Sequence, residues 1–169
     1  MSQQEAGMAE RSSLGTYGGE MQFVGCQVGR EEYGFDILQV KEVIRLPELT
    51  RVPNLPEFVE GVINLRGCVI PVVALRRCFG LDRSEHNKHS RVVVIELKGA
   101  VFGFVVDAVS EVLRVSQKTV EPPPRLGRTK REYVSGIGKL DGRLLLVLDL
   151  DRLLPNTEQA AYREAAPAN

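Results

Sequence analysis

The sequence of 169 residues lacks an excess of charge of either sign, because 22 Lys and Arg residues balance 22 Asp and Glu residues. A balanced chain has no overall field that would draw it to nucleic acid or to an anionic membrane surface. No apolar run approaches the roughly 20 residues that a transmembrane helix needs. The first residues, 1–6, lack the basic region and the apolar core of a secretory signal. We therefore expect a cytoplasmic protein.

Cysteine and histidine are also scarce. The three cysteines are widely spaced, form no Cys-x-x-Cys pair and have apolar neighbours, so we interpret them as reduced packing residues. The only histidines, His86 and His89, lie in one polar loop that offers a metal ion neither sulfur nor a preset geometry. No Gly-x-Ser-x-Gly occurs, and the glycines of residues 136–142 do not have the spacing of a nucleotide-binding loop. We predict no metal, no cofactor and no catalytic residue, and therefore a protein that is not an enzyme.

The chain does contain many short apolar runs that are rich in β-branched and aromatic residues and are separated by Gly, Pro and Asp. Such runs predict β-strands. Prolines exclude a long helix between residues 47 and 56, and we expect only short helices at 75–79 and 151–154. Residues 40–44 fit either a strand or a helical turn. The predicted strands make the chain all-β. They cover residues 22–28, 33–37, 62–64, 69–73, 92–97, 101–106, 111–115 and 144–150.

The stretch 61–73 predicts a β-hairpin. Two β-branched runs flank the polar break Leu65-Arg66-Gly67, and Gly67 can take the positive φ that a tight turn requires. This prediction places the charge of Arg66 at the tip of a stiff hairpin. Two interpretations stay open at this point, namely a solvated turn residue and a contact with a partner.

An internal repeat supports the hairpin. Gly34-Phe35 precedes a Val-x-Glu-Val motif that starts at Val40, and Gly103-Phe104 precedes the same motif at the same spacing, starting at Val109. Further along, Leu65-Arg66-Gly67 matches Leu140-Asp141-Gly142, whose Asp-Gly is a strong hairpin-turn signal. Two similar halves predict two small β units, most simply barrels of about five strands. Because such barrels have thin cores, we expect them to share an apolar seam.

A basic cluster follows the three consecutive prolines of residues 122–124. Arg125, Arg128, Lys130 and Arg131 fit a solvated loop or, as an alternative function, a nucleic-acid site on a small SH3-like barrel. Such sites usually carry aromatic residues that stack on bases, but the chain has no Trp and this cluster has only Tyr133 beside it. The composition therefore favours a module that binds protein.

Several motifs together closely resemble the CheW family, the coupling proteins of bacterial chemotaxis-type signalling arrays. The resemblance covers about residues 21–154, and Gly61-Val62-Ile63-Asn64-Leu65-Arg66-Gly67 is its most specific segment. The other motifs that carry it are Glu32-Tyr33-Gly34-Phe35-Asp36-Ile37, Val40-Lys41-Glu42-Val43-Ile44, Val52-Pro53-Asn54-Leu55-Pro56, Gly103-Phe104-Val105-Val106-Asp107 and Leu146-Val147-Leu148-Asp149-Leu150.

The resemblance implies a fold of two five-stranded SH3-like β-barrels packed around a shared hydrophobic core. We expect a flexible N-terminal arm over residues 1–19, a CheW-like domain over 20–154 and a C-terminal tail over 155–169. Within the domain, we expect one barrel from residues 33–90 and the other from residues 20–32 together with 91–154.

The resemblance also implies a function without catalysis. Members of the family couple the cytoplasmic tips of methyl-accepting chemoreceptors to the regulatory domain of the histidine kinase CheA, which would recruit this chain to membrane receptor arrays. The receptor-binding residues that it implies are Val40, Glu42, Gly61, Asn64, Arg66, Val92 and Val112. For Val40, Val92 and Val112, core packing remains an equal alternative. The kinase-binding residues that it implies are Leu49, Arg51 and Leu126.

One position departs from the family pattern. The family usually has Asp where this chain has Ala74, whereas the second half of the repeat retains the acid as Asp149. A contact made by that side chain is therefore in question for the first half.

Overall fold

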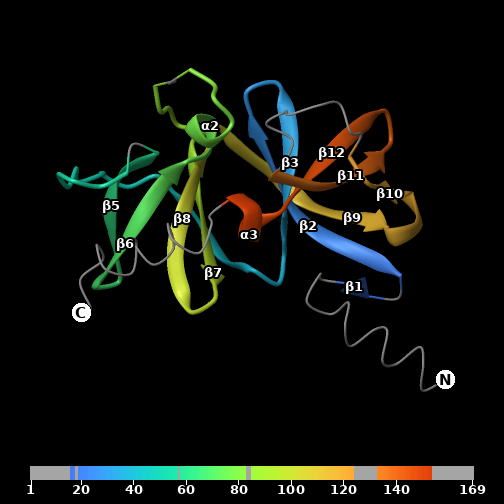
Figure 1. Ribbon diagram of the computed structural model, residues 1–169, viewed down its shortest axis with the longest axis horizontal. Helices are drawn as coiled ribbons and strands as arrows, with labels where there is room; N and C mark the ends of the chain where they lie inside the picture. The colour runs from blue at the N-terminus through green and yellow to red at the C-terminus, as the bar shows by residue number, and fades with distance from the viewer. Residues whose placement is uncertain (1–15, 18, 57, 83–84, 124–132, 154–169) are drawn as a thin grey trace.

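The protein is described from a computed structural model that covers residues 16–17, 19–56, 58–82, 85–123 and 133–153 (Figure 1). The leucine Leu126 and the basic cluster at 125–131 lie outside these residues, as do the tail at 155–169 and the N-terminal arm except for 16–17 and 19. None of the helices in the described part of the chain is long and apolar enough to cross a membrane.

Strands dominate the described residues, as the sequence predicts, and the helices are short. Residues 40–44, for which two interpretations were open, belong to a strand. The elements are β1 Thr16–Tyr17, β2 Glu20–Val28, β3 Glu31–Asp36, β4 Val40–Arg45, β5 Val59–Leu65, β6 Cys68–Ala74, α2 Leu75–Cys78, β7 Arg91–Leu97, β8 Ala100–Val106, β9 Ala108–Ser116, η2 Gln117–Thr119, β10 Val120–Glu121, β11 Val134–Leu140, β12 Arg143–Leu148 and α3 Leu150–Leu153.

The strands form two sheets that lie side by side in Figure 1. The seven-stranded sheet has the order β1-β2-β3-β12-β11-β10, with β9 also paired to β2, and the five-stranded sheet has the order β4-β7-β8-β6-β5. The two halves of the sequence repeat exchange strands between these sheets. The Gly34-Phe35 strand β3 runs parallel to β12, and the Gly103-Phe104 strand β8 runs parallel to β6. Each sheet therefore combines the leading hairpin of one half with the remaining strands of the other.

This exchange corrects the expected barrel boundaries. β3 pairs with β2 and β12, so residues 33–36 belong to the seven-stranded sheet and not to the 33–90 unit. β7 and β8 pair with β4 and β6, so residues 91–106 belong to the five-stranded sheet. Each Gly-Phe strand carries a fully buried phenylalanine, and the rings of Phe35 and Phe104 contact each other in the seam between the sheets, with their centroids 5.7 Å apart. The strand β1 also shows that residues 16–17, expected in the arm, pair with β2.

Both sheets curl so that their ends approach each other. β9 and β10 lie at the two ends of the seven-stranded path, yet only the short helix η2 separates them in the chain. In the five-stranded sheet, Thr50 follows β4 and bridges to Val62 on β5, at the opposite end of the path. The all-β class with two sheets is confirmed. The hydrogen-bonded ladder among the described residues does not close either sheet into a complete barrel, so the expected closure is not confirmed.

Three apolar clusters hold the described residues together. One lies within the seven-stranded sheet around Phe23 and Leu145, and another lies within the five-stranded sheet around Ile63 and Val72. The largest cluster, which we call the seam core, draws on both sheets, as the predicted shared seam requires. It includes Val24, Cys26, Tyr33 and Phe35 from one sheet and Val73, Val93, Ile95, Phe102 and Phe104 from the other.

Candidate protein-interaction site

The turn between β5 and β6 is a tight two-residue turn, which confirms the predicted hairpin. Leu65 pairs with Cys68, and the two residues between them have positive φ, 52° at Arg66 and 85° at Gly67. This backbone matches the right-handed twist of paired strands, although it favours Gly, Asn or Asp over Arg at its first position. The Asn64 side-chain oxygen accepts a hydrogen bond from the Gly67 N–H at 2.8 Å and so fixes the tip.

The Arg66 side chain is oriented by Glu42 on β4, the strand at the other end of the five-stranded path. Its two terminal nitrogens lie 2.5 and 2.7 Å from the two carboxylate oxygens of Glu42. The hydrogen bond from Arg66 lowers the pKa of Glu42, and the same bond raises the pKa of Arg66, so both groups stay charged. The arginine side chain is nevertheless 72% exposed, against 26% for the glutamate. The pair therefore presents a fixed guanidinium to solvent.

Gly61 lies where β5 meets the segment that carries the expected kinase-binding residues. A Cβ atom at Gly61 would lie 2.6 Å from the carbonyl oxygen of Thr50. Thr50 exchanges two backbone hydrogen bonds with Val62, at 2.8 and 2.9 Å. The glycine thus permits a close backbone approach, which places Leu49 against the core of the five-stranded sheet and leaves Arg51 exposed.

The three candidate valines lie in different environments. Val92 on β7 has no exposed surface, packs in the core of the five-stranded sheet and fills the space beside Gly103, so it is a packing residue and not a surface contact. Val40 is partly buried against the seam core. Val112 is 51% exposed and lies on β9 in the other sheet. The structure therefore brings Glu42, Asn64 and Arg66 together at one hairpin tip, whereas Val112 lies elsewhere.

One exposed apolar residue near this set escaped the sequence analysis. Val43 on β4 is 37% exposed and is the repeat counterpart of Val112. The Val-x-Glu-Val repeat was the signal that could have identified it, because equivalent positions on equivalent strands take equivalent faces.

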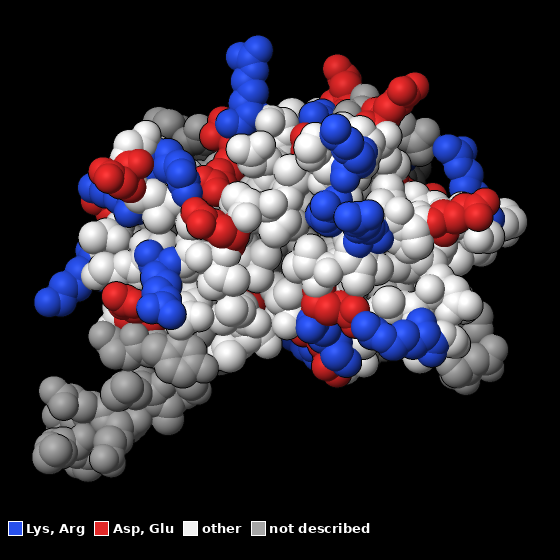
Figure 2. Space-filling model, turned by 180° about the vertical axis from the view of Figure 1, so that it is seen from behind, with Lys and Arg blue, Asp and Glu red and all other residues white. Residues whose placement is uncertain are grey.

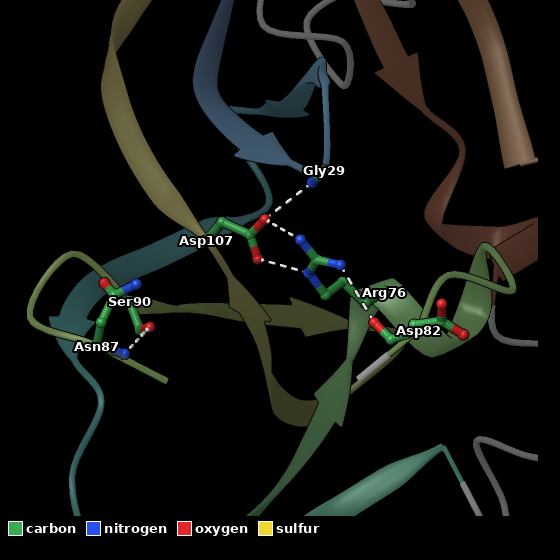
Figure 3. Close-up of polar contacts among 6 residues, drawn as sticks. All are labelled: Gly29, Arg76, Asp82, Asn87, Ser90 and Asp107. Carbon is green, nitrogen blue, oxygen red and sulfur yellow. Dashed lines mark hydrogen bonds and ion pairs between the residues drawn. The ribbon is translucent and has the colours of Figure 1, made fainter. Parts of the chain in front are cut away.

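A second polar cluster, not predicted as a site, ties the two sheets together at Asp107 (Figure 3). Its carboxylate accepts hydrogen bonds from Arg76 on α2, at 2.9 and 3.0 Å, and from the N–H of Gly29 in the β2–β3 turn, at 2.8 Å. Arg76 also donates to the carbonyl oxygen of Asp82 at 3.1 Å. Burial by itself raises the pKa of Asp107, but the hydrogen bonds from Arg76 and Gly29 outweigh it, so the pKa lies below its usual range.

The cluster borders a cavity of about 250 Å³ that also contains His86. The imidazole Nε2 of His86 lies 2.7 Å from a carboxylate oxygen of Glu60. Within the described ranges no group of three or more His, Cys, Asp or Glu side chains is placed to hold a metal ion.

The cysteines do not all have the packing role that the sequence predicts. Cys26 is fully buried, and burial raises the pKa of its thiol. Cys68, in contrast, is exposed on the β5–β6 hairpin.

The structure shows what is lost by having an alanine at position 74 where the family usually has an aspartate. The backbone N–H groups of Ala74 and Asp149 donate to the carbonyl oxygens of Phe58 and Tyr133, so the two positions are equivalent. Asp149 also accepts a hydrogen bond from the N–H of Arg152 at 3.2 Å and thereby caps α3. Ala74 stands at the N-cap of α2 and makes no side-chain cap bond. The departure from the family therefore removes one helix cap.

Comparisons with known proteins support this description. The family model for the CheW-like domain matches residues 22–158. The chain is 35% identical over 165 residues to the chemotaxis protein CheW of Klebsiella aerogenes, covering 97% of this chain and 99% of that protein. It is 37% identical over 134 residues to the chemotaxis protein CheW of Helicobacter pylori, covering 79% and 81% of the two chains. The crystal structure of the scaffolding protein TtCheW from Thermoanaerobacter tengcongensis superposes with a TM-score of 0.74 at 36% identity, covering 82% of this chain and 90% of that one.

Proposed function

The chain belongs to the CheW-like family and has the role of a chemotaxis adaptor, and we propose that it joins the cytoplasmic tips of methyl-accepting chemoreceptors to the regulatory domain of a CheA-type histidine kinase. In this role it catalyses no reaction and is recruited to membrane receptor arrays through its partners. The single observation that carries the proposal is the extent of the similarity, which covers 99% of the Klebsiella chemotaxis protein and extends across both sheets.

The receptor-binding part of the proposal centres on Arg66. Glu42 occupies one N–H of each terminal nitrogen, and the guanidinium has further N–H donors that point to no described partner. These donors suit a carboxylate or the carbonyl groups at the end of a partner helix. Glu42 is in this account a positioning residue, because it holds the guanidinium in one orientation before the partner arrives.

The remaining contacts are assigned by position. Asn64 and Gly61 shape the hairpin, Val40 borders the seam, and Val112 extends the receptor-binding surface to the other sheet. Val92 supports this surface from within the core. The kinase is proposed to bind at Leu49 and Arg51, beside the Thr50–Val62 bridge, with a further contact at Leu126.

A charge-swap experiment tests the proposal. Arg66→Glu places two carboxylates together and removes the donors, so we expect a folded protein that no longer assembles receptor hairpin and kinase into one complex. The double variant Arg66→Glu with Glu42→Arg restores an ion pair of reversed polarity. Since the partner would then meet a carboxylate in place of a guanidinium, assembly should stay lost.

The measurement is co-sedimentation of kinase and receptor fragment with each variant, with circular dichroism as the control for folding. If the Arg66→Glu variant assembles the complex as well as the parent chain does, Arg66 is not part of the interface. Recovery of assembly in the double variant would show that the pair acts only within the chain. Failure of the parent chain itself to assemble the two partners would contradict the proposed coupling.

A further inference from the structure

A cavity of about 370 Å³ is lined by strands of the seven-stranded sheet and by the start of α3. Its volume lies within the range of roughly 300–1,000 Å³ that small-molecule sites occupy. Apolar side chains form much of the wall, among them Met21, Phe23, Val120 and Val147. A mostly apolar cavity with a small number of polar groups is typical of a site for a small organic ligand.

The most deeply buried of the polar groups is the carboxyl of Asp36, at the end of β3. Asp36 lies directly opposite Phe23 in the β2–β3 pair, and residues opposite each other in an antiparallel pair share a face. Phe23 packs in the core of the seven-stranded sheet and borders the same cavity, so the Asp36 side chain is directed into it. The preceding residue, Phe35, points the other way, into the seam core. Asp36 is only 5% exposed.

This buried carboxylate is only half satisfied. Its Oδ1 accepts a hydrogen bond from the Leu38 N–H at 3.0 Å. Among the described residues no donor reaches Oδ2 and no cation pairs with the group. Burial without a counter-charge disfavours the ionised form and raises the pKa of Asp36 to about 6. The fold itself does not demand an acid here, because the repeat counterpart on β8 is the buried Val105.

The other two carboxylates that border the cavity already have cations. Asp149 lies 3.5 Å from Nε of Arg152, and Asp151 lies 3.3 Å from Nζ of Lys98. The same mixing of signs is visible on the rear of the molecule, where Lys and Arg side chains lie among Asp and Glu side chains (Figure 2). Asp36 differs from these groups, since its counter-charge is missing and the space beside it is a cavity.

We propose that this cavity is a binding site for a small organic amine, whose ammonium group donates to Oδ2 of Asp36 and whose apolar body packs against Met21 and Phe23. An ammonium group has three donors, and Gln39 and Ser135, which also border the cavity, carry further oxygen acceptors. The inference goes beyond the proposed function and does not depend on it. None of the described residues assigned to receptor or kinase borders the cavity.

Binding of 2-phenylethylamine to the purified chain, followed by NMR shifts of the backbone amides, tests the proposal. The reference is 2-phenylethanol, which has the same shape but no charge. The amine should bind the parent about tenfold more tightly than the alcohol, because a hydrogen bond between two charged groups is the stronger one. Shifts caused by both ligands should be concentrated at the residues that line the cavity.

Asp36→Asn keeps the acceptor for Leu38 and removes the charge, so its ratio of amine to alcohol affinity should fall to about one. The matched control is Asp141→Asn, which makes the same substitution at an exposed carboxyl on the β11–β12 turn and should keep the tenfold ratio. In the parent, affinity for the amine should fall as the pH is lowered from about 7 to about 5, since Asp36 becomes protonated, whereas affinity for the alcohol should change little.

Three results would each overturn the inference. The first is the absence of shifts at the lining residues with either ligand. The second is equal affinity of the parent for amine and alcohol, which needs no variant to be folded. The third is an unchanged preference for the amine in Asp36→Asn, because binding would then not involve this carboxylate.

Discussion

The hairpins β5–β6 and β11–β12 occupy equivalent places in the two sheets, but their tips differ. At the first tip Arg66 has a positive φ and a bidentate bond to Glu42. At the second tip Asp141 takes the equivalent position without a positive φ, and Lys139 pairs with Glu121 instead. The second hairpin shows that this fold forms without an arginine at the tip. This difference supports the proposal that Arg66 serves assembly and not folding.

The energetics of the first tip support this view. A left-handed conformation costs a residue other than Gly roughly 1–2 kcal/mol. An exposed ion pair such as Arg66 with Glu42 contributes little to stability, because water and salt screen its charges. Since the second contribution does no more than offset the first, stability alone does not favour Arg66 over Asn or Gly at this position.

The largest expected difference between the two copies concerns their equivalent glycines. Gly61→Ala should lower the free energy of unfolding by about 2–3 kcal/mol, because its Cβ would meet the backbone of Thr50. Gly136→Ala should cost only about 1 kcal/mol, because the nearest atom, 2.8 Å away, belongs to the rotatable side chain of Val120. Urea unfolding of both variants provides the measurement, and equal losses would show that the Thr50 contact is not specific to the first copy.

A smaller difference concerns Asp36, whose repeat counterpart is the buried Val105. Burial raises the pKa of Asp36 to about 6, despite the hydrogen bond from the Leu38 N–H. Because the folded pKa lies above the unfolded value, the stability linked to this proton is complete below about pH 4 and is lost as the pH rises through about 6.

Asp36→Asn keeps the acceptor for Leu38 and removes the charge. We expect the variant to be more stable than the parent by about 1–2 kcal/mol above pH 7, and the difference to disappear near pH 4. Asp36 borders a cavity of about 370 Å³, so we expect the energetic effect of its burial to be smaller than for a fully enclosed carboxyl. Urea unfolding at a series of pH values tests this, and a difference independent of pH would contradict it.

The smallest effect concerns the helix caps. Asp149→Ala should cost about 1 kcal/mol, since it removes the bond to the Arg152 N–H. Ala74→Asp should gain about 0.5–1 kcal/mol by supplying the missing cap of α2. Ala74→Asn supplies a capping side chain without a charge. It therefore separates the effect of capping from the effect of a new negative charge beside Asp107. Thermal unfolding measures all three variants, and a loss of stability in both Ala74 variants would show that the cavity does not accept the longer side chain.

Much of the fold could be predicted from the sequence. The repeat and the β-branched runs indicated two β units, the Asp141-Gly142 signal located both hairpin turns, and the need for a larger core predicted the seam. The exchange of hairpins could not be predicted, because periodicity identifies strands but not their neighbours. Pairing of β3 with β12 joins residues far apart in the chain, which a local pattern does not reveal.

The site could be predicted in part. The turn chemistry placed Arg66 at a tip, and the family resemblance supplied Glu42, but no sequence pattern shows that the two side chains meet. Val92 lies in the run Val92-Val93-Val94-Ile95, which is buried on both faces and so has no alternation to distinguish core from surface. The cluster at Asp107 could not be predicted for a similar reason, since Gly29, in the β2–β3 turn, and Arg76, on α2, are both distant from Asp107 in the chain.

The most direct test of the central claim is a matched comparison of Arg66→Asn with Asp141→Asn in receptor–kinase co-sedimentation. Asn is suited to the turn at either tip, so both variants should unfold within about 0.5 kcal/mol of the parent. We expect Arg66→Asn to lose most of the assembly and Asp141→Asn to retain it. Equal assembly by the two variants, whether full or lost, would contradict the claim that the first hairpin tip serves assembly while the second serves the fold.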